Sequence, residues 1–289
     1  MEGDKMARIR PAQHQGTFYP ADAAILNQQL DWLLDHAALE PNPPIKAIVS
    51  PHAGYDYSGR VAGMAYAALQ GQSSPQRVVI LAPNHQQANR LSSICDYTHF
   101  ATPLGEVAVD QAFIQQHWAK LPHVQQDNRI HQAEYSIEVQ LPFIQRCLPG
   151  IPIAPILLGQ GNEQDITDII QPAWDDPRTL IVISSDLYHY QPRAAALALG
   201  LHTSLWLEDK QYTAITPERA CGYAALRGVM QLAQQQACYW RTLAIQHSGQ
   251  ANRFQPHTLV GYGAFVLVTP HPSSLSGSSY RCKQTANAQ

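Results

Sequence analysis

Runs rich in apolar and β-branched residues at positions 45–49, 77–81 and 179–183 predict buried strands. A strand that is apolar at nearly every position, as 179–183 is, has both of its faces covered, as in a parallel sheet between helices. The same kind of pattern predicts further strands at 92–97, 105–109, 151–158, 238–246 and 258–268.

Apolar residues recur at helical spacing between these runs. A helix capped by Asp22 would bury a stripe of leucines at positions 26, 30, 33 and 34. Further helices are expected at 60–69, 110–119, 133–148, 163–171, 193–207 and 216–235. Pro142 is expected to bend the helix at 133–148. The alternation of strands and helices predicts one α/β domain over residues 9–269.

The two ends of the chain differ in composition from this domain. Residues 1–8 are expected to form a flexible N-terminus, and the Ser-rich, polar residues 270–289 a disordered tail. Residues 1–20 lack an apolar core after a basic start, so no secretory signal is expected.

Composition and charge exclude several classes of function. In the 289-residue chain, 45% of the residues are hydrophobic, which is ordinary for a soluble globular protein. The formal net charge is −3 and no Lys/Arg cluster stands out, which argues against nucleic acid as the partner. No apolar run has membrane-spanning length. The five cysteines are widely spaced without a C-x-x-C pair, which favours a reducing cytoplasm over a disulfide framework.

Two histidines follow buried strands in matching contexts. His52 lies in SPHAGYDYSG (50–59) after the first strand, and His85 follows Pro83 and Asn84 after the second. Parallel strands end at one edge of a sheet, where open α/β folds place their chemistry. Neutral imidazoles suit iron, copper or zinc. The alternative is that each histidine merely caps its strand by hydrogen bonding, but two matching histidines favour a metal site.

Asp186 and His189 follow a third strand in SSDLYHY (184–190). A carboxylate and an imidazole three residues apart can both face a cleft, as acid/base and orienting group or as ligands. A helix-capping aspartate beside an exposed histidine is the alternative.

His131 and Glu134 lie three residues apart at the start of the helix expected at 133–148. In a first turn, Glu134 would be favoured by the helix dipole alone. If Glu134 faced inward beside Ile137 and Leu141, its carboxylate would need a partner.

Cys221 lies in ACGY (220–223), at the expected start of a helix whose amides would lower the thiol pKa. A thiolate is a nucleophile and a soft metal ligand. The alternatives are a small buried apolar residue and the nucleophile of a cysteine hydrolase with His189 as its base.

Taken together, these segments resemble the MEMO family, the AmmeMemoRadiSam system protein B group. The matching segments occur in family order over residues about 8–268: GTFYPAD (16–22), SPHAGYDYSG (50–59), Pro83–His85, HQAEYSIEVQLPF (131–143), SSDLYHY (184–190), ACGY (220–223) and VGYG (260–263).

The resemblance implies a fold like that of the class III extradiol dioxygenases, a single domain with a central mixed sheet flanked by helices. It implies that His52, His85 and Cys221 occupy the family's three metal-ligand positions, with iron or copper as the metal. It implies further pocket residues, which are Asp186, His189, His131, Glu134 and Tyr55.

The activity implied is redox or dioxygenase-like chemistry on an unknown small molecule. Extradiol enzymes hold iron(II) with two histidines and a carboxylate. Here Cys221 would replace the carboxylate, which argues against ordinary ring cleavage. The alternative is a non-catalytic binding module that acts with an AMMECR1-like and a radical SAM partner.

Three positions depart from the family pattern. Tyr135 stands where many relatives have His, Tyr188 where Ser or Cys is usual, and Ala224-Ala225 replaces a common Gly-Pro. These changes would alter the pocket's shape and leave the three expected ligands intact.

Overall fold

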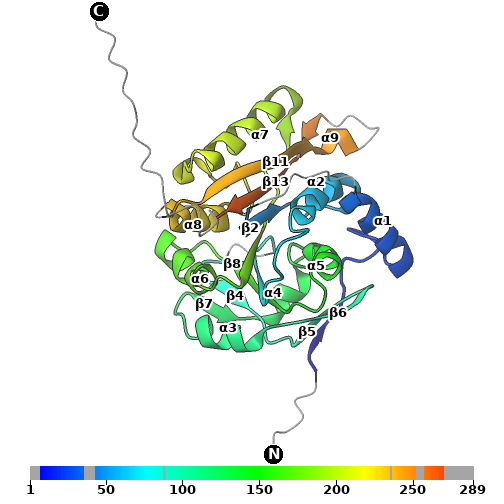
Figure 1. The fold of residues 1–289 in the computed structure, drawn as a ribbon, viewed down its shortest axis with the longest axis vertical. Helices are drawn as coiled ribbons and strands as arrows, with labels where there is room; N and C mark the ends of the chain where they lie inside the picture. Colours follow the sequence, from blue (N-terminus) through cyan, green and yellow to red (C-terminus); the bar gives the residue numbers. More distant parts are fainter. Residues whose placement is uncertain (1–6, 36–42, 87–88, 235, 252–256, 270–289) are drawn as a thin grey trace, which may run out of the picture.

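A computed structural model describes residues 7–35, 43–86, 89–234, 236–251 and 257–269. Its centre is an eight-stranded mixed sheet with helices on both sides (Figure 1). The strand order is β11-β13-β2-β9-β3-β8-β4-β7. The expected α/β fold with a large central mixed sheet is therefore confirmed.

The sheet consists of β2 (Ile45–Ser50), β3 (Arg77–Pro83), β4 (Ser92–Ile94), β7 (Val124–Gln126), β8 (Ile153–Leu158), β9 (Thr179–Ser184), β11 (Tyr239–His247) and β13 (Gly261–Val268). Strands β2, β9, β3 and β8 are mutually parallel, whereas β13 runs antiparallel to β2. Strand β9 therefore separates β2 from β3, and all three end at the same edge. Smaller sheets are formed by β1 (Ile9–Arg10), β5 (His99–Thr102) and β6 (Gly105–Ala108), and by β10 (Gln191–Pro192) and β12 (Thr258–Leu259).

Helices cover the sheet as the apolar runs require. The α-helices are α1 (Ala23–Asp35), α2 (Tyr55–Ala67), α3 (Gln111–His117), α4 (Asn128–Ala133), α5 (Leu141–Cys147), α6 (Glu163–Asp175), α7 (Arg193–Glu208), α8 (Tyr223–Gln234) and α9 (Ser248–Ala251). Helix α1 packs on α2, which lies on β2 and β13, whereas α7 packs on β11 and β13 (Figure 1). The leucines expected to form the buried stripe of α1 are all buried. Among the described residues, no helix has the length and apolarity needed to cross a membrane.

Lys46 is the polar exception inside the apolar run of β2. Its ammonium donates hydrogen bonds to the carbonyls of Ala173, Asp176 and Thr179, at 2.8, 2.7 and 3.1 Å. Burial lowers the pKa of Lys46 to about 8, against the opposing charge of Asp176. The three carbonyls compensate this ammonium for the water it loses.

The prediction of one helix over residues 133–148 is wrong. The chain leaves α4 at Glu134, whose backbone is extended (φ −86, ψ 130). It forms a short 3-10 helix, η1 (Glu138–Gln140), and then α5. Pro142 occupies the first turn of α5, where its missing N–H costs nothing, so it starts this helix and does not bend one.

Two other helix boundaries differ from the expectation. Helix α2 begins at Tyr55, five residues before the expected start. Helix α8 begins only at Tyr223, because the Cys221 amide donates to the Asp186 carbonyl at 3.2 Å and so holds residue 221 outside the helix.

The expected terminal segments fall largely outside the described residues. Residues 1–6 and 270–289 lie outside them. Arg8, within the expected flexible N-terminus, contacts Asp96 at 2.7 Å.

Candidate metal centre

The candidate residues follow the carboxyl ends of three neighbouring strands. His52 follows β2, Asp186 follows β9 and His85 follows β3. Ser50 and Ser184 are paired across β2 and β9, so these two strands end level with each other. The edge that sequence analysis predicted is therefore the one at which these residues gather.

His52, His85 and Cys221 each offer one ligand atom, and these three atoms all lie within 4.8 Å of one another. The His52 side chain is fully buried, and its Nε2 lies 3.2 Å from the Cys221 Sγ. The two imidazole rings meet edge to face at 5.1 Å. Two nitrogens and one sulfur thus converge on one point.

The hydrogen bonds of Ser184 fix the tautomer of His52. The Ser184 hydroxyl donates to the Ser136 carbonyl at 2.7 Å and accepts from the Gln140 amide nitrogen at 2.9 Å. Because its only proton is used, it must accept the bond from His52 Nδ1, also at 2.9 Å. Nδ1 therefore carries the ring proton, and the Nε2 lone pair faces Cys221. Burial, and then the neighbouring His85, keep the pKa of His52 well below its ordinary value.

The Glu134 carboxylate orients His85 in the same way. Its Oε1 lies 3.0 Å from His85 Nδ1, and its Oε2 accepts from the His85 amide at 2.6 Å. Burial acts to raise the pKa of Glu134, but bonds from His85 and the Ser136 amide lower it to about 2. An ionised carboxylate only accepts, so His85 also carries its proton on Nδ1 and presents Nε2. Glu134 is the C-cap residue of α4 and does not lie in the first turn of a helix. The prediction that a helix dipole favours its carboxylate is therefore wrong.

Cys221 lies in the turn before α8 and not at its first amides. Its sulfur accepts a hydrogen bond from the Asp186 amide at 3.2 Å. Burial, and then the charge of Asp186, raise the pKa of this thiol well above its ordinary value. The expectation that helix amides would lower this pKa is therefore wrong. A buried sulfur beside two imidazole lone pairs becomes a thiolate when a cation binds to all three.

Asp186 and His189 are close but play different structural parts. Asp186 Oδ1 accepts from the His52 amide at 2.9 Å, so the carboxylate holds the segment that carries His52. Its Oδ2 lies 3.9 Å from His189 Nε2, and the His189 side chain is 35% exposed. Burial raises the pKa of Asp186 and lowers that of His189, which favours the uncharged form of each group.

Tyr135 forms an aromatic wall of the site that sequence analysis did not assign. Its ring is parallel to His85 at 4.9 Å and edge-on to His52 at 5.7 Å. On its other side it stacks with Phe18 at 4.6 Å and meets His14 edge-on at 5.8 Å. Tyr135 thus places a phenol ring flat against an expected ligand.

Two expected pocket residues make their contacts elsewhere. His131 Nε2 lies 2.8 Å from the Ser93 carbonyl on β4, and the ring is fully buried there. The Tyr55 hydroxyl donates to the Val139 carbonyl at 2.8 Å, and its ring packs on Phe143. Their role as pocket residues stays a prediction.

The residues that sequence analysis missed are mainly those that orient ligands. Ser184 and Gln140 are ordinary polar residues in sequence, and only their contacts reveal what they do. The doublet Ser184-Ser185 directly after an apolar strand was the one available signal.

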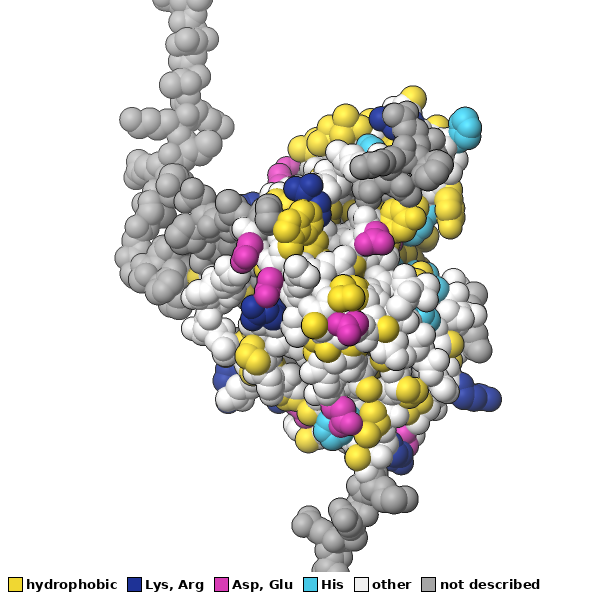
Figure 2. Space-filling model, turned by 90° about the vertical axis from the view of Figure 1, so that its right-hand side faces the viewer, with side chains coloured by type: hydrophobic (Ala, Val, Ile, Leu, Met, Phe, Trp, Pro, Cys, Tyr) yellow, Lys and Arg dark blue, Asp and Glu magenta, His cyan; other side chains and the backbone are white. Residues whose placement is uncertain are grey.

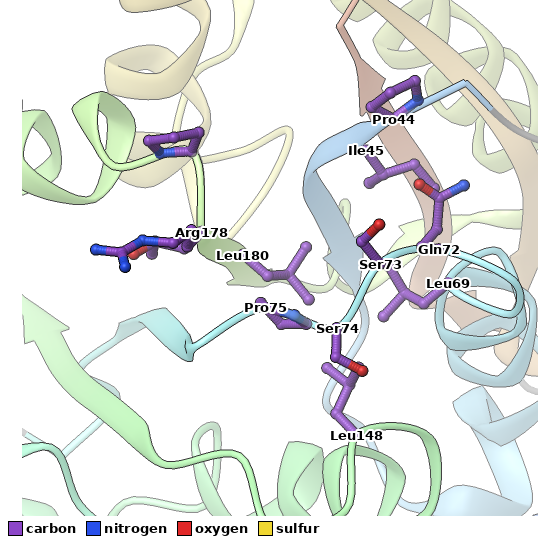
Figure 3. A pocket seen from close by; sticks show the side chains of 12 residues that line it. Pro44, Ile45, Leu69, Gln72, Ser73, Ser74, Pro75, Leu148, Arg178 and Leu180 are labelled. Atoms are coloured by element: carbon purple, nitrogen blue, oxygen red, sulfur yellow. The ribbon is translucent and has the colours of Figure 1, made fainter.

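A cavity of about 160 Å³ opens beside the cluster and is lined by both His85 and Cys221. A larger cavity of about 220 Å³ lies at the opposite edge of the sheet, where β2 and β9 begin (Figure 3). Ile45, Leu180 and Arg178 line that second cavity, which is roughly one strand length, about 20 Å, from the cluster. The smaller cavity is therefore the one adjacent to the candidate chemistry.

Comparison with known proteins shows which proteins this chain is similar to. Residues 10–265 match the family model described as Memo-like protein. A MEMO1 family protein of Sulfolobus acidocaldarius is 33% identical over 252 residues, which cover 78% of this chain and 88% of that protein. One from Aquifex aeolicus is 35% identical, over 65% of this chain and 70% of that protein.

Two further proteins extend the comparison. The protein memo-1 homolog of Caenorhabditis elegans is 34% identical over 68% of this chain, and the match spans 57% of the worm protein's length. The crystal structure of the uncharacterized protein JW3007 from Escherichia coli K12 has a TM-score of 0.50 at 12% identity, covering 78% of this chain and 99% of that one. At that identity the likeness concerns the fold alone.

Proposed function

This chain belongs to the Memo family, and from that premise we propose that it binds one iron or copper ion and carries out redox chemistry on a small molecule. The observation that carries the proposal is the convergence of two histidines and one cysteine whose ligand atoms lie within 4.8 Å of one another. Each imidazole presents Nε2 because a buried acceptor holds its Nδ1 proton.

The donor set fits a redox metal. Two imidazoles with one thiolate form a soft site, and the thiolate favours copper or alters the redox behaviour of iron. When bound, such an ion would supply the exchange of single electrons with a substrate. Ser184 and Glu134 fit the part of supporting groups that hold ligating histidines in one orientation.

In this proposal, His189 moves a proton and Asp186 positions the groups around it. His189 is partly exposed, so its Nε2 can exchange a proton with a substrate or with water. Asp186 binds the amide of His52 through one oxygen and faces His189 through the other. Tyr135 stacks on both Phe18 and His85, so these rings form an aromatic wall beside the expected ligands.

The cysteine-hydrolase alternative is less well supported. A nucleophilic cysteine needs a lowered pKa and a base beside it. Burial raises the pKa of Cys221, and the imidazole beside its sulfur is His52, which lies between Cys221 and Ser184. His189 is the expected base, but among the described residues the Cys221 sulfur has hydrogen-bond contacts with Ser185, Asp186 and His52 and none with His189.

Elemental analysis of untagged protein, made without added metal, tests the proposal. We expect about one equivalent of iron or copper per chain, and its loss when His52, His85 and Cys221 are all changed to alanine. A matched control changes the exposed His257 and the α5 residue Cys147 to alanine, and it should keep the metal. Copper would add a thiolate-to-metal absorption band that Cys221→Ser removes. Stoichiometric metal in the triple variant would contradict the assignment of these three residues as the metal ligands.

A second candidate function uses the same pocket for binding without turnover. Its partners would be an AMMECR1-like and a radical SAM protein, as the family's system name suggests. Pull-down with these two proteins, set beside assays for turnover, separates the two functions. Binding that depends on the pocket residues, with no turnover of any kind, would favour the second.

A further inference from the structure

The outward face of α7 is apolar along most of its length. Leu197, Leu201 and Leu205 are 60%, 48% and 53% exposed. Because they are four residues apart, they form one ridge on the helix surface. Hydrophobic side chains gather at the top of the molecule in Figure 2, where Figure 1 places α7. Single exposed leucines are ordinary, but three on one ridge form a patch that a partner would cover.

These leucines are not needed to hold α7 on the sheet. The opposite face of the helix is already buried through Ala196, Gly200, Thr203 and Leu207. At Gly200 the fit is so close that an added Cβ would lie 2.7 Å from the Ile245 side chain. The outer ridge is thus free to serve another contact.

Two of the charged residues of α7, Arg193 and Asp209, lie at equal distances from Leu201, whereas the third, Glu208, accepts a hydrogen bond from the Thr242 amide on β11 at 2.9 Å. Arg193 begins the helix and Asp209 is its C-cap residue. Within the described part of the chain, neither residue takes part in an ion pair. Leu201 is the midpoint between Leu197 and Leu205, and also between Arg193 and Asp209. A two-fold axis at Leu201 would therefore place each leucine opposite a leucine, and Arg193 of one copy level with Asp209 of the other.

We propose that the outward face of α7 binds a second copy of this chain, with the two α7 helices antiparallel about Leu201. This self-complementarity is the property that an isologous contact requires, and an unrelated partner has no need of it. The proposal is independent of the metal site, because none of its residues belongs to that site.

The size of the contact predicts a weak dimer. A 16-residue helix is about 24 Å long and about 10 Å wide, so two such faces bury roughly 500 Å². Stable interfaces bury at least about 1,200 Å². Dimerisation should accordingly be weak and should increase with protein concentration.

Sedimentation velocity of the full chain, from about 1 µM to about 300 µM at low salt, tests this contact. The mass should rise from 32.0 kDa toward twice that value as concentration increases. Leu201→Glu places two carboxylates on the axis and should weaken association at least tenfold. Ile25→Glu changes a residue on α1 that is 58% exposed, and it should leave association unchanged. Circular dichroism checks that both variants fold.

A charge exchange tests the antiparallel register. Arg193→Asp and Asp209→Arg should each weaken the dimer, since each puts like charges opposite one another. The double variant should restore association to within about twofold of the original. A chain that stays monomeric at all concentrations would overturn the proposal, and so would a Leu201→Glu variant that dimerises normally. A double variant without rescue would overturn the register. If residues 270–289 of the same chain covered α7 instead, the protein would stay monomeric at all concentrations.

Discussion

At the scale of single residues, the geometry of the candidate site depends on groups outside the expected ligand set. The Tyr66 hydroxyl donates to the Gln140 side-chain oxygen at 3.0 Å, which fixes which end of that amide faces Ser184. Gln140 then donates to Ser184, and Ser184 accepts the proton of His52. The direction of each hydrogen bond follows from the one before it. The buried Tyr66 on α2 therefore determines that His52 carries its proton on Nδ1 and presents the lone pair of Nε2.

Removing Ser184 tests this relay. In Ser184→Ala, the Nδ1 proton of His52 loses its acceptor, and the Nε2 tautomer is no longer enforced. Supporting groups of this kind are worth about 10–100-fold in metal affinity, so we expect a loss in that range. The measurement is a competition titration against a coloured chelator.

Ser204→Ala is the matched control, because Ser204 is also a buried serine but bonds a carbonyl within α7. It should leave metal affinity unchanged. Equal affinity in Ser184→Ala and in the unaltered protein would show that the ring does not need this acceptor.

At the scale of elements, β1 holds the segment that carries Glu134. Arg10 on β1 is fully buried and donates to the carbonyls of His131 and Glu134, at 2.7 and 2.9 Å. Its guanidinium also pairs with Glu138 at 2.5 Å. Glu138 in turn accepts from the Tyr19 hydroxyl at 2.6 Å. One buried ion pair thus fixes the exit from α4 and with it the carboxylate that orients His85.

Breaking this ion pair should be costly. Arg10→Met leaves the Glu138 carboxylate buried without its cation, which costs about 3–5 kcal/mol of unfolding free energy. Arg8→Met, two residues earlier, breaks the ion pair with Asp96, in which the Arg8 side chain is 55% exposed, and should cost under about 1 kcal/mol. Urea denaturation of the two variants gives both values. Equal losses would contradict the view that Arg10 fixes this segment.

Elements with a strong internal pattern were predictable from sequence. The largely apolar runs predicted β2, β3 and β9 nearly to the residue, and they also placed His52, His85 and Asp186 at one edge. The segment 133–148 has helical spacing of Ile137, Leu141 and Ile144, and all three are indeed buried. The helix breaks there because the Glu134 carboxylate bonds the amides of Ser136 and His85, contacts that no local pattern reveals.

Cys221 shows, within the site itself, that local sequence does not reveal contacts with distant segments. The sequence placed it at a helix start, and the inference of a lowered pKa followed from that position. A backbone hydrogen bond to the Asp186 loop, far away in sequence, holds residue 221 outside the helix, which begins at Tyr223 and not at residue 216. Burial then decides the direction of the pKa shift.

At the scale of the whole molecule, folding buries several groups in uncharged form. His131 is fully buried, and its Nδ1 has no hydrogen-bond partner among the described residues. Burial lowers the pKa of His131 to about 4, although the Ser93 carbonyl acts in the opposite direction. The unfolded chain, with an ordinary histidine pKa, therefore takes up a proton at a higher pH than the folded protein does.

The consequence is a loss of stability in mild acid. Between about pH 6.5 and about pH 4 only the unfolded chain binds this proton, so stability falls as the pH falls through that window. At pH 5 this one group should cost about 2 kcal/mol relative to pH 7. His131→Gln, which can still donate to the Ser93 carbonyl, should show a smaller loss.

Urea unfolding of chelator-treated protein at pH 7, 6 and 5 measures the difference between the two proteins. Other titrating groups cancel because both chains carry them. His257→Gln, at an exposed position, should follow the unaltered protein. An identical pH dependence for His131→Gln would contradict the assignment.

The position of β9 between β2 and β3 has a consequence for the chain during its synthesis. The strands that precede His52 and His85 begin 134 and 102 residues before the strand that must lie between them, so they emerge from the ribosome first. The nascent chain therefore holds two exposed strand edges until residue 184 has been made. The sulfur at residue 221 comes later still. The three expected ligands are thus present together only once residue 221 has been made, while β11 and β13 are still to come. A chain truncated before that residue would lack the sulfur and should not take up the ion.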